Sequence, residues 1–324
     1  LFRSMDGVIE DTLKQVINLA MFCNRIQIPY RVLAFTTQYH DRRDDSAALH
    51  DRYTKLQEFN RAKYTKQEGK NILSNTRDHF TLLELFSNKM TTSEFHAMAK
   101  RVIDFRFHWN DGYSMGGTPL NEALAWVYLN IDSYIKQNSI EKMTLITLTD
   151  GEGGSLQSSN HLEDKKYIRD GDQYKQLKYK HFIRDAVTQK TYEFSRYSAI
   201  QTETILRMIK DRHNIMVVGF YICRNNRRDL SSVIRANLPK FNGGEYNQID
   251  AWRKEFRENG FASITGTGRD DLFLIPQTST KIQEGELEVS GDASAKAIAN
   301  KFGKFLNVKK TSRVLLNQFV GYVA

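Results

Sequence analysis

The sequence has little of what marks a secreted, disulfide-bonded or membrane protein. Only two cysteines occur in 324 residues, Cys23 and Cys223, and both stand in apolar stretches. Isolated cysteines of this kind are typical of buried thiols rather than of a disulfide, which suits a reducing cytoplasm. No apolar run approaches the ~18 residues of a membrane span, and the first residues lack the pattern of a signal peptide. We therefore expect a cytoplasmic protein that does not enter the membrane.

Several motifs of catalytic and metal-binding proteins are also missing. The chain has no CxxC and no HExxH, so a structural zinc site is not expected. The Gly-Gly-Thr-Pro segment at 116–119 is not followed by the Gly-Lys-Ser/Thr of a phosphate-binding P-loop. The eight histidines show no ligand spacing, which favours surface or loop positions for them.

The composition allows a sizeable core, because 40% of the residues are hydrophobic, and the formal net charge is +9. A positive balance of this size is compatible with binding to a polyanion, with docking to an acidic protein partner, or with a soluble surface. Composition does not choose among the three.

Hydrophobic periodicity predicts helices that alternate with buried strands, which is the pattern of an α/β fold. We predict a doubly wound, mostly parallel sheet flanked by helices, with residues 80–86 as a candidate antiparallel edge. The predicted strands are 28–37, 80–86, 142–149, 215–222, and either 261–265 or 271–275. The predicted helices are 8–26, 47–60, 91–105, 119–137, 197–212, 229–237 and 248–258.

The domain organisation follows from shifts in composition along the chain. Residues 1–275 are expected to form one domain, interrupted by a polar insertion at about 155–192. Alternating residues predict a hairpin at 175–194 that turns near 185–189. A polar linker at 276–293 then leads to a C-terminal helical tail at 294–324.

The chain is organised around the stretch that runs from Lys142 through Asp150 to Gly154. Its apolar and β-branched residues predict a strand buried on both faces, and the chain breaks at glycine directly afterwards. Asp150 would then stand at the carboxyl end of the strand, where open α/β sheets bind their ligands. An Asp that merely begins a turn is the alternative.

Two hydroxyl residues complete a candidate metal site with Asp150. Thr118 and Ser4 also stand in loops that would meet at the carboxyl edge of the sheet. Hydroxyl and carboxylate oxygens suit Mg²⁺ or another hard divalent cation. Ser4, Thr118 and Asp150 carry too few charges to enclose the ion, so we expect an incoming acidic group to complete the site.

The same residues resemble a von Willebrand factor A domain. The similarity rests on Ser4-Met5 before a helix, the Gly116-Gly-Thr-Pro-Leu-Asn-Glu loop and the strand end Thr149-Asp150-Gly-Glu152. It is closest to the A domain of CobT-like cobaltochelatase subunits, including phage versions, through the Phe22–Thr37 segment. By motif, Ser4 would be the last Ser of the DxSxS strand end, with Thr118 and Asp150 as the separate Thr and Asp of the metal-ion-dependent adhesion site.

This resemblance implies a non-catalytic subunit that binds other proteins through the metal. Mg²⁺ would bridge to an acidic residue of a partner, and the expected partner is an AAA+ ATPase of the CobS or MoxR kind. In a chelatase, such an assembly inserts a metal ion into a tetrapyrrole.

Two other hypotheses compete with this one. The chain has Phe2 where the family has the first Ser, and Arg3 where it usually has Gly. These departures, with the net charge, favour a structural or nucleic-acid-associated protein that keeps the fold but has a degenerate metal site. A hydrolase that uses Asp150 as nucleophile, with Glu152 as its orienting acid, is the third hypothesis.

The insertion mixes basic and aromatic residues. Such a mixture is found in surfaces that bind single-stranded nucleic acid, but a solvated hairpin or a docking site for an acidic protein would have the same composition. The basic residues are Lys165, Lys166, Lys175, Lys178, Lys180, Arg184 and Lys190, and the aromatic residues are Tyr167, Tyr174, Tyr179, Phe182 and Tyr192.

Overall fold

The structure is a computed structural model that describes the chain in segments. The described residues are 9–38, 73–74, 80–104, 113–114, 118–149, 153–158, 165–170, 173–178, 180–195, 197–223, 230, 233–234 and 246–276. The predicted helix at 47–60, nearly all of the linker and the whole of the C-terminal tail lie outside these residues.

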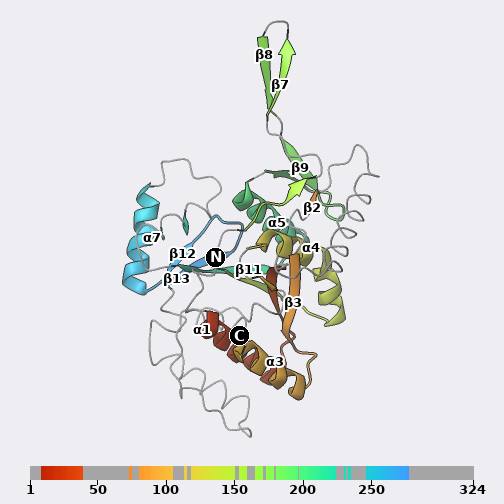
Figure 1. The fold of residues 1–324 in the computed structure, drawn as a ribbon, viewed down its shortest axis with the longest axis vertical. Helices are drawn as coiled ribbons and strands as arrows, with labels where there is room; N and C mark the ends of the chain where they lie inside the picture. Colours follow the sequence, from red (N-terminus) through yellow and green to blue (C-terminus); the bar gives the residue numbers. More distant parts are fainter. Residues whose placement is uncertain are drawn as a thin grey trace, which may run out of the picture.

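A four-stranded sheet with the order β12-β13-β11-β5 lies at the centre of the molecule (Figure 1). Its strands are β5 (Thr144–Thr149), β11 (Met216–Cys223), β12 (Ala262–Ile264) and β13 (Asp271–Pro276). β5, β11 and β13 run parallel, and β12 joins β13 antiparallel. The prediction of an α/β fold with a mostly parallel sheet is confirmed for this part. Both segments that were predicted as alternatives for the last strand, 261–265 and 271–275, form strands.

Helices cover both faces of this sheet. They are α1 (Ile9–Arg25) on one face, and α4 (Leu120–Gln137), α5 (Ser198–His213) and α7 (Tyr246–Asn259) on the other. The alternation of side chains along β11 explains the two layers. Val218 and Phe220 pack in a cluster with α1, whereas Val217 packs with α4 and α5, and Tyr221 with α7.

The predicted strands 215–222 and 142–149 differ in their burial. β11 is buried along nearly its whole length because strands flank it on both sides. β5 is only half-buried over most of its length, since among the described residues it pairs with β11 alone. The prediction of a strand buried on both faces is therefore right for β11 and only partly right for β5.

The first predicted strand belongs to a second, antiparallel sheet. β1 (Arg31–Gln38) lies between β3 (Phe80–Ser87) and β4 (Tyr113–Ser114), and both pairings are antiparallel. The predicted strand at 80–86 is present as β3 and is antiparallel, but it lies at the edge of this second sheet and not of the mostly parallel one. α1 joins the two sheets, because Ile17 and Ala20 pack against Phe86 of β3 and against α3 (Thr92–Asp104).

The insertion forms two hairpins instead of the single one expected at 175–194. β9 (His181–Arg184) pairs with β10 (Thr191–Phe194) about a turn at 185–190, as predicted. The predicted first strand of that hairpin was too long. Its residues 175–178 belong to β8 (Gln173–Lys178), which pairs with β7 (Lys165–Asp170) instead. A short bridge joins β2 (Leu73–Ser74) to β6 (Gln157–Ser158).

The helix starts follow the chemistry read from the sequence. At α3, the backbone N–H of Thr91 donates to Glu94 Oε2 over 2.8 Å, and the Glu94 N–H donates to Thr91 Oγ1 over 3.3 Å. This reciprocal pair is a capping box, encoded by the segment Thr91-Thr-Ser-Glu94. At α4, Pro119 is the N-cap residue.

Both cysteines are free and buried, as predicted. Burial raises the pKa of the Cys23 thiol to about 11. In the described part of the chain, no helix has the length and apolar character needed to span a bilayer.

Candidate functional site

The candidate site lies where the loop after β5 meets the start of α4. Thr118 is half-buried and immediately precedes the Pro119 N-cap. Ser4 and Asp150 lie outside the described residues, but the chain is described again from Gly153, three residues after Asp150. The structure therefore positions one of the three predicted ligands and the segment that follows another.

A backbone hydrogen bond joins these two segments directly. The N–H of Gly154 donates to the carbonyl oxygen of Thr118 over 2.9 Å. The approach is close, because a Cβ atom on Gly153 would lie 3.3 Å from Leu120 Cβ and 3.4 Å from Asn121 Cγ. Gly153 and Gly154 therefore lie beside Thr118 and the first residues of α4.

The buried side chain of Asn121 fixes this junction. Its Nδ2 donates to the carbonyl oxygens of Gly154, over 2.8 Å, and Ser198, over 3.2 Å. Its Oδ1 accepts from the hydroxyl of Thr202 over 2.6 Å. One fully buried amide therefore connects α4, the loop after β5 and the first turn of α5.

Gln201 holds the same loop from the side of α5. Its Oε1 accepts from the N–H of Leu156 over 2.7 Å, and its Nε2 donates to the Leu156 carbonyl oxygen over 3.0 Å. Nε2 also donates to the carbonyl oxygen of Ser195 over 2.9 Å. The side chain pairs with Leu156 as a neighbouring strand would, so the loop has a defined backbone position although it is not part of a sheet.

Two helix N-termini converge on this loop. α4 reaches it through Thr118 and Asn121, and α5 reaches it through Ser198 and Gln201. The N-terminus of a helix carries a partial positive charge, which favours carboxylates nearby. Glu122, in the first turn of α4, is only 5% exposed and is one such carboxylate. The electrostatics of the junction suit an acidic residue in the adjoining loop.

Of the three proposed metal ligands, the structure describes Thr118 alone. Its hydroxyl is an oxygen ligand of the kind that Mg²⁺ accepts, and its carbonyl oxygen binds the N–H of Gly154. In the described segments, no three His, Cys, Asp or Glu side chains lie close enough together to hold a metal ion. The predicted set therefore depends on Ser4 and Asp150, both outside these segments.

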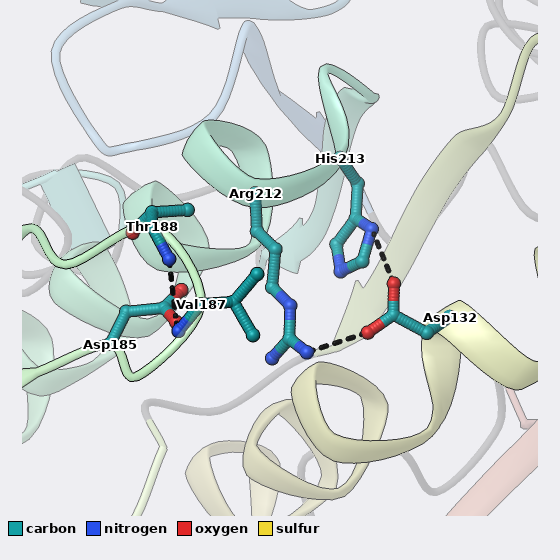
Figure 2. Close-up of polar contacts among 6 residues, drawn as sticks. All are labelled: Asp132, Asp185, Val187, Thr188, Arg212 and His213. Carbon is teal, nitrogen blue, oxygen red and sulfur yellow. Dashed lines mark hydrogen bonds and ion pairs between the residues drawn. The ribbon is translucent and has the colours of Figure 1, made fainter.

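Apart from this junction, a cluster of charged residues lies between α4, α5 and the β9–β10 turn (Figure 2). Arg212 Nη2 lies 2.6 Å from Asp132 Oδ2, and His213 Nδ1 lies 3.3 Å from Asp132 Oδ1. The guanidinium of Arg212 also stacks over the ring of Tyr128, with 5.2 Å to its centroid. Burial lowers the pKa of His213. The carboxylate of Asp132 acts to raise this pKa, and the cation of Arg212 acts to lower it.

Asp185, 1% exposed, organises the turn itself. Its Oδ1 accepts from the N–H groups of Val187, over 2.7 Å, and Thr188, over 3.3 Å (Figure 2). Burial acts to raise the pKa of this carboxyl, but these two hydrogen bonds, the Tyr128 hydroxyl and the Arg212 cation together lower the pKa. All the partners are parts of the fold, so we assign this cluster a structural role.

Searches of protein-family models, curated proteins and solved structures find no match to this chain.

The sequence analysis missed the two residues that build the junction. Asn121 stood within the Thr118 loop motif without a role, and Gln201 was not singled out. Their signal in the sequence is an amide side chain in the first turn of a predicted helix, where polar residues satisfy neighbouring backbone groups. That signal does not reveal which distant segment the amide binds.

Proposed function

We propose that the chain is a metal-dependent protein-interaction subunit of the von Willebrand factor A type. Thr118 and Asp150, with Ser4, would hold Mg²⁺ at the carboxyl edge of β5. The ion supplies a positive centre with an open coordination position, and an acidic residue of a partner protein fills that position. The chain itself acts as a coupling subunit and not as a catalyst.

One observation carries this proposal. The Gly154 N–H donates to the Thr118 carbonyl oxygen over 2.9 Å, so the segment that follows Asp150 lies beside one proposed ligand. Ligand sites in open α/β sheets occupy the carboxyl edge of the strands. The buried amides of Asn121 and Gln201 support the proposal further, because they hold the backbone of Gly154 and Leu156.

The proposed partner is a cytoplasmic AAA+ ATPase of the CobS or MoxR kind. This part of the proposal rests on the resemblance of the Ser4, Thr118 and Asp150 segments to CobT-like subunits. The ATPase would hydrolyse the nucleotide, while this chain would connect it to the target through the metal.

A binding assay with a purified ATPase of this kind tests the proposal. Immobilised chain is expected to retain the ATPase in Mg²⁺ and to release it in EDTA. Thr118→Ala and Asp150→Ala are expected to lose Mg²⁺-dependent binding. The matched controls are Thr191→Ala on the exposed side of β10 and Asp250→Ala on α7, where the carboxylate is paired with Arg253.

Binding that ignores both EDTA and the two site substitutions would contradict the proposal. So would equal losses in the site variants and their controls, because those would report unfolding or a general charge effect.

A further inference from the structure

The hairpin of β7 and β8 projects from the body of the molecule (Figure 1). The two strands pair only with each other among the described residues, in a register that runs from Lys165 opposite Lys178 to Asp170 opposite Gln173. A two-stranded ribbon has two faces, and residues directly opposite one another share a face. The register therefore sorts its residues into two sets.

The two sets differ in chemistry. One face, here named the basic–aromatic face, combines three cations with two tyrosines and contains no acid; its residues are Lys165, Tyr167, Arg169, Tyr174, Gln176 and Lys178. The opposite face combines two cations with two aliphatic residues and an acid; its residues are Lys166, Ile168, Asp170, Gln173, Lys175 and Leu177. All the aromatic residues of the paired strands thus share one face with most of the cations.

β9, which follows the hairpin in the chain, carries a second group of basic and aromatic residues. Phe182 is 60% exposed and stands between Lys180 and Arg184, which are also exposed. The alternate residues of β10, Tyr192 and Phe194, are buried instead. The structure therefore removes Tyr192 from the set of aromatic residues available to a partner and retains Phe182.

One acidic residue lies beside this outer surface of β9. Glu193 is opposite Phe182 and lies 3.3 Å from the ammonium of Lys180. Both side chains are more than half exposed, at 58% and 70%. Exposed ion pairs contribute little, so Lys180 remains available to a phosphate group.

We propose that the basic–aromatic face, together with Lys180, Phe182 and Arg184, binds single-stranded nucleic acid. Residues i and i+2 of a strand lie about 7 Å apart, so cations and rings alternate at that spacing along each strand. Cations neutralise backbone phosphates while aromatic rings stack on unpaired bases. An acidic protein surface would satisfy the cations but would leave the rings without stacking partners. This inference does not depend on the proposed metal site.

Fluorescence anisotropy with a labelled oligothymidylate, measured at several salt concentrations, tests the proposal. Each of Tyr167→Ala and Tyr174→Ala is expected to weaken binding roughly 5- to 150-fold, the range for loss of one stacked base. Tyr167→Phe, which keeps the ring, is expected to bind as the wild type does. Circular dichroism melts verify that each variant is folded.

The register provides a matched pair of charge variants. Lys165→Gln with Lys178→Gln removes two cations from the basic–aromatic face, whereas Lys166→Gln with Lys175→Gln removes two from the opposite face. The first pair is expected to reduce the slope of log affinity against log salt by about 1.4, which corresponds to two phosphate contacts on a single strand. The second pair is expected to leave the slope nearly unchanged.

Three results would overturn the proposal. They are the absence of oligothymidylate binding at low salt, equal losses from the two charge pairs, and tyrosine variants that bind as well as the wild type. If polyglutamate also displaces the oligonucleotide from those unaffected tyrosine variants, the surface is a docking site for an acidic protein.

Discussion

The hydroxyl of Thr202 donates to Oδ1 of Asn121 over 2.6 Å and so joins the first turns of α5 and α4. The same amide donates to the carbonyl oxygen of Gly154, whose N–H binds Thr118. The position of a proposed metal ligand is therefore set by a buried side chain that is not itself a proposed ligand. We therefore expect Asn121 to couple the stability of the fold to the proposed metal binding.

Asn121→Ala is expected to lower the free energy of unfolding by about 1–3 kcal/mol. The substitution removes the Nδ2 donor to the half-buried carbonyl oxygens of Gly154 and Ser198 and the Oδ1 acceptor of the Thr202 hydroxyl, and the loss of such hydrogen bonds carries a cost of that order. Urea denaturation measures the change.

Asn130→Ala is the matched control for that substitution. Asn130 is also on α4, but its Nδ2 donates to the carbonyl oxygen of Trp126 within the same helix. We expect a change within about 0.5 kcal/mol, as for most substitutions away from buried networks. Equal effects at both positions would contradict the role assigned to Asn121.

Gly219→Ala is expected to destabilise the central sheet by about 1–3 kcal/mol through overpacking. A Cβ atom at this position of β11 would lie 2.5 Å from Cδ and 2.6 Å from Nε of Arg269. Arg269 is only 7% exposed, and its burial lowers the pKa of the guanidinium to about 10. The side chain has little room to move.

A double-mutant cycle measured by denaturation tests this contact. In an Arg269→Ala background, Gly219→Ala is expected to be less costly by about 0.5–3 kcal/mol, because the clashing atoms are absent. Strictly additive effects would show that the crowding at Gly219 comes from elsewhere.

His213 is expected to make stability depend on pH below its ordinary pKa of 6.5. Burial lowers the folded-state pKa, so the unfolded chain binds the proton more readily. The contribution of His213 to the free energy of unfolding is therefore fully present above pH 6.5 and is lost as the pH falls toward the folded-state pKa. The groups that influence the ring are Asp132, which favours its charged form, Arg212, which opposes it, and Asp185, which again favours it.

The free energy of unfolding, measured by urea denaturation between pH 5 and 7.5, checks this expectation. His213→Gln cannot titrate and should flatten the dependence in that range. Asp185 and Asp211 have lowered pKa values and contribute only at more acid pH. A variant with an unchanged pH profile would rule out His213 as the source.

Asp185→Ala is expected to lower the free energy of unfolding by about 1.5–3 kcal/mol, the range for hydrogen bonds to charged groups. The substitution removes the acceptor for the N–H groups of Val187 and Thr188. Asp185→Asn, which keeps an acceptor oxygen, should cost less. Thermal denaturation compares the two, and a larger loss in the Asn variant would contradict this account of the turn.

Local chemistry in the sequence predicted much of the fold. The capping box at Thr91 and Glu94 and the apolar run of β11 specify their elements from neighbouring residues, and the structure shows both. The turn near 185–189 was also predictable from its own residues. Each of these signals lies within one turn of helix or one strand.

The sequence did not reveal which distant segments would meet. Alternation in 175–194 indicates strands but not their partners, so the pairing of β8 with β7 was missed. Asn121 and Gln201 bind residues 33 to 81 positions away, and no short-range pattern records those contacts. Thr118 and Asp150 were predicted to share one edge of a parallel sheet. Asp150 lies outside the described residues, so this stays a prediction.

The most direct test of the central claim is Mn²⁺ binding by the full chain, followed by electron paramagnetic resonance with Mg²⁺ as competitor. Mn²⁺ serves as the probe because it accepts the same oxygen ligands. We expect Mn²⁺ to bind at one site and Mg²⁺ to displace it. Thr118→Ala should weaken this binding and Asp150→Asn should abolish it, whereas Thr191→Ala should leave it unchanged. A chain that binds no Mn²⁺, or that binds it equally well without Thr118 and Asp150, would contradict the proposed site.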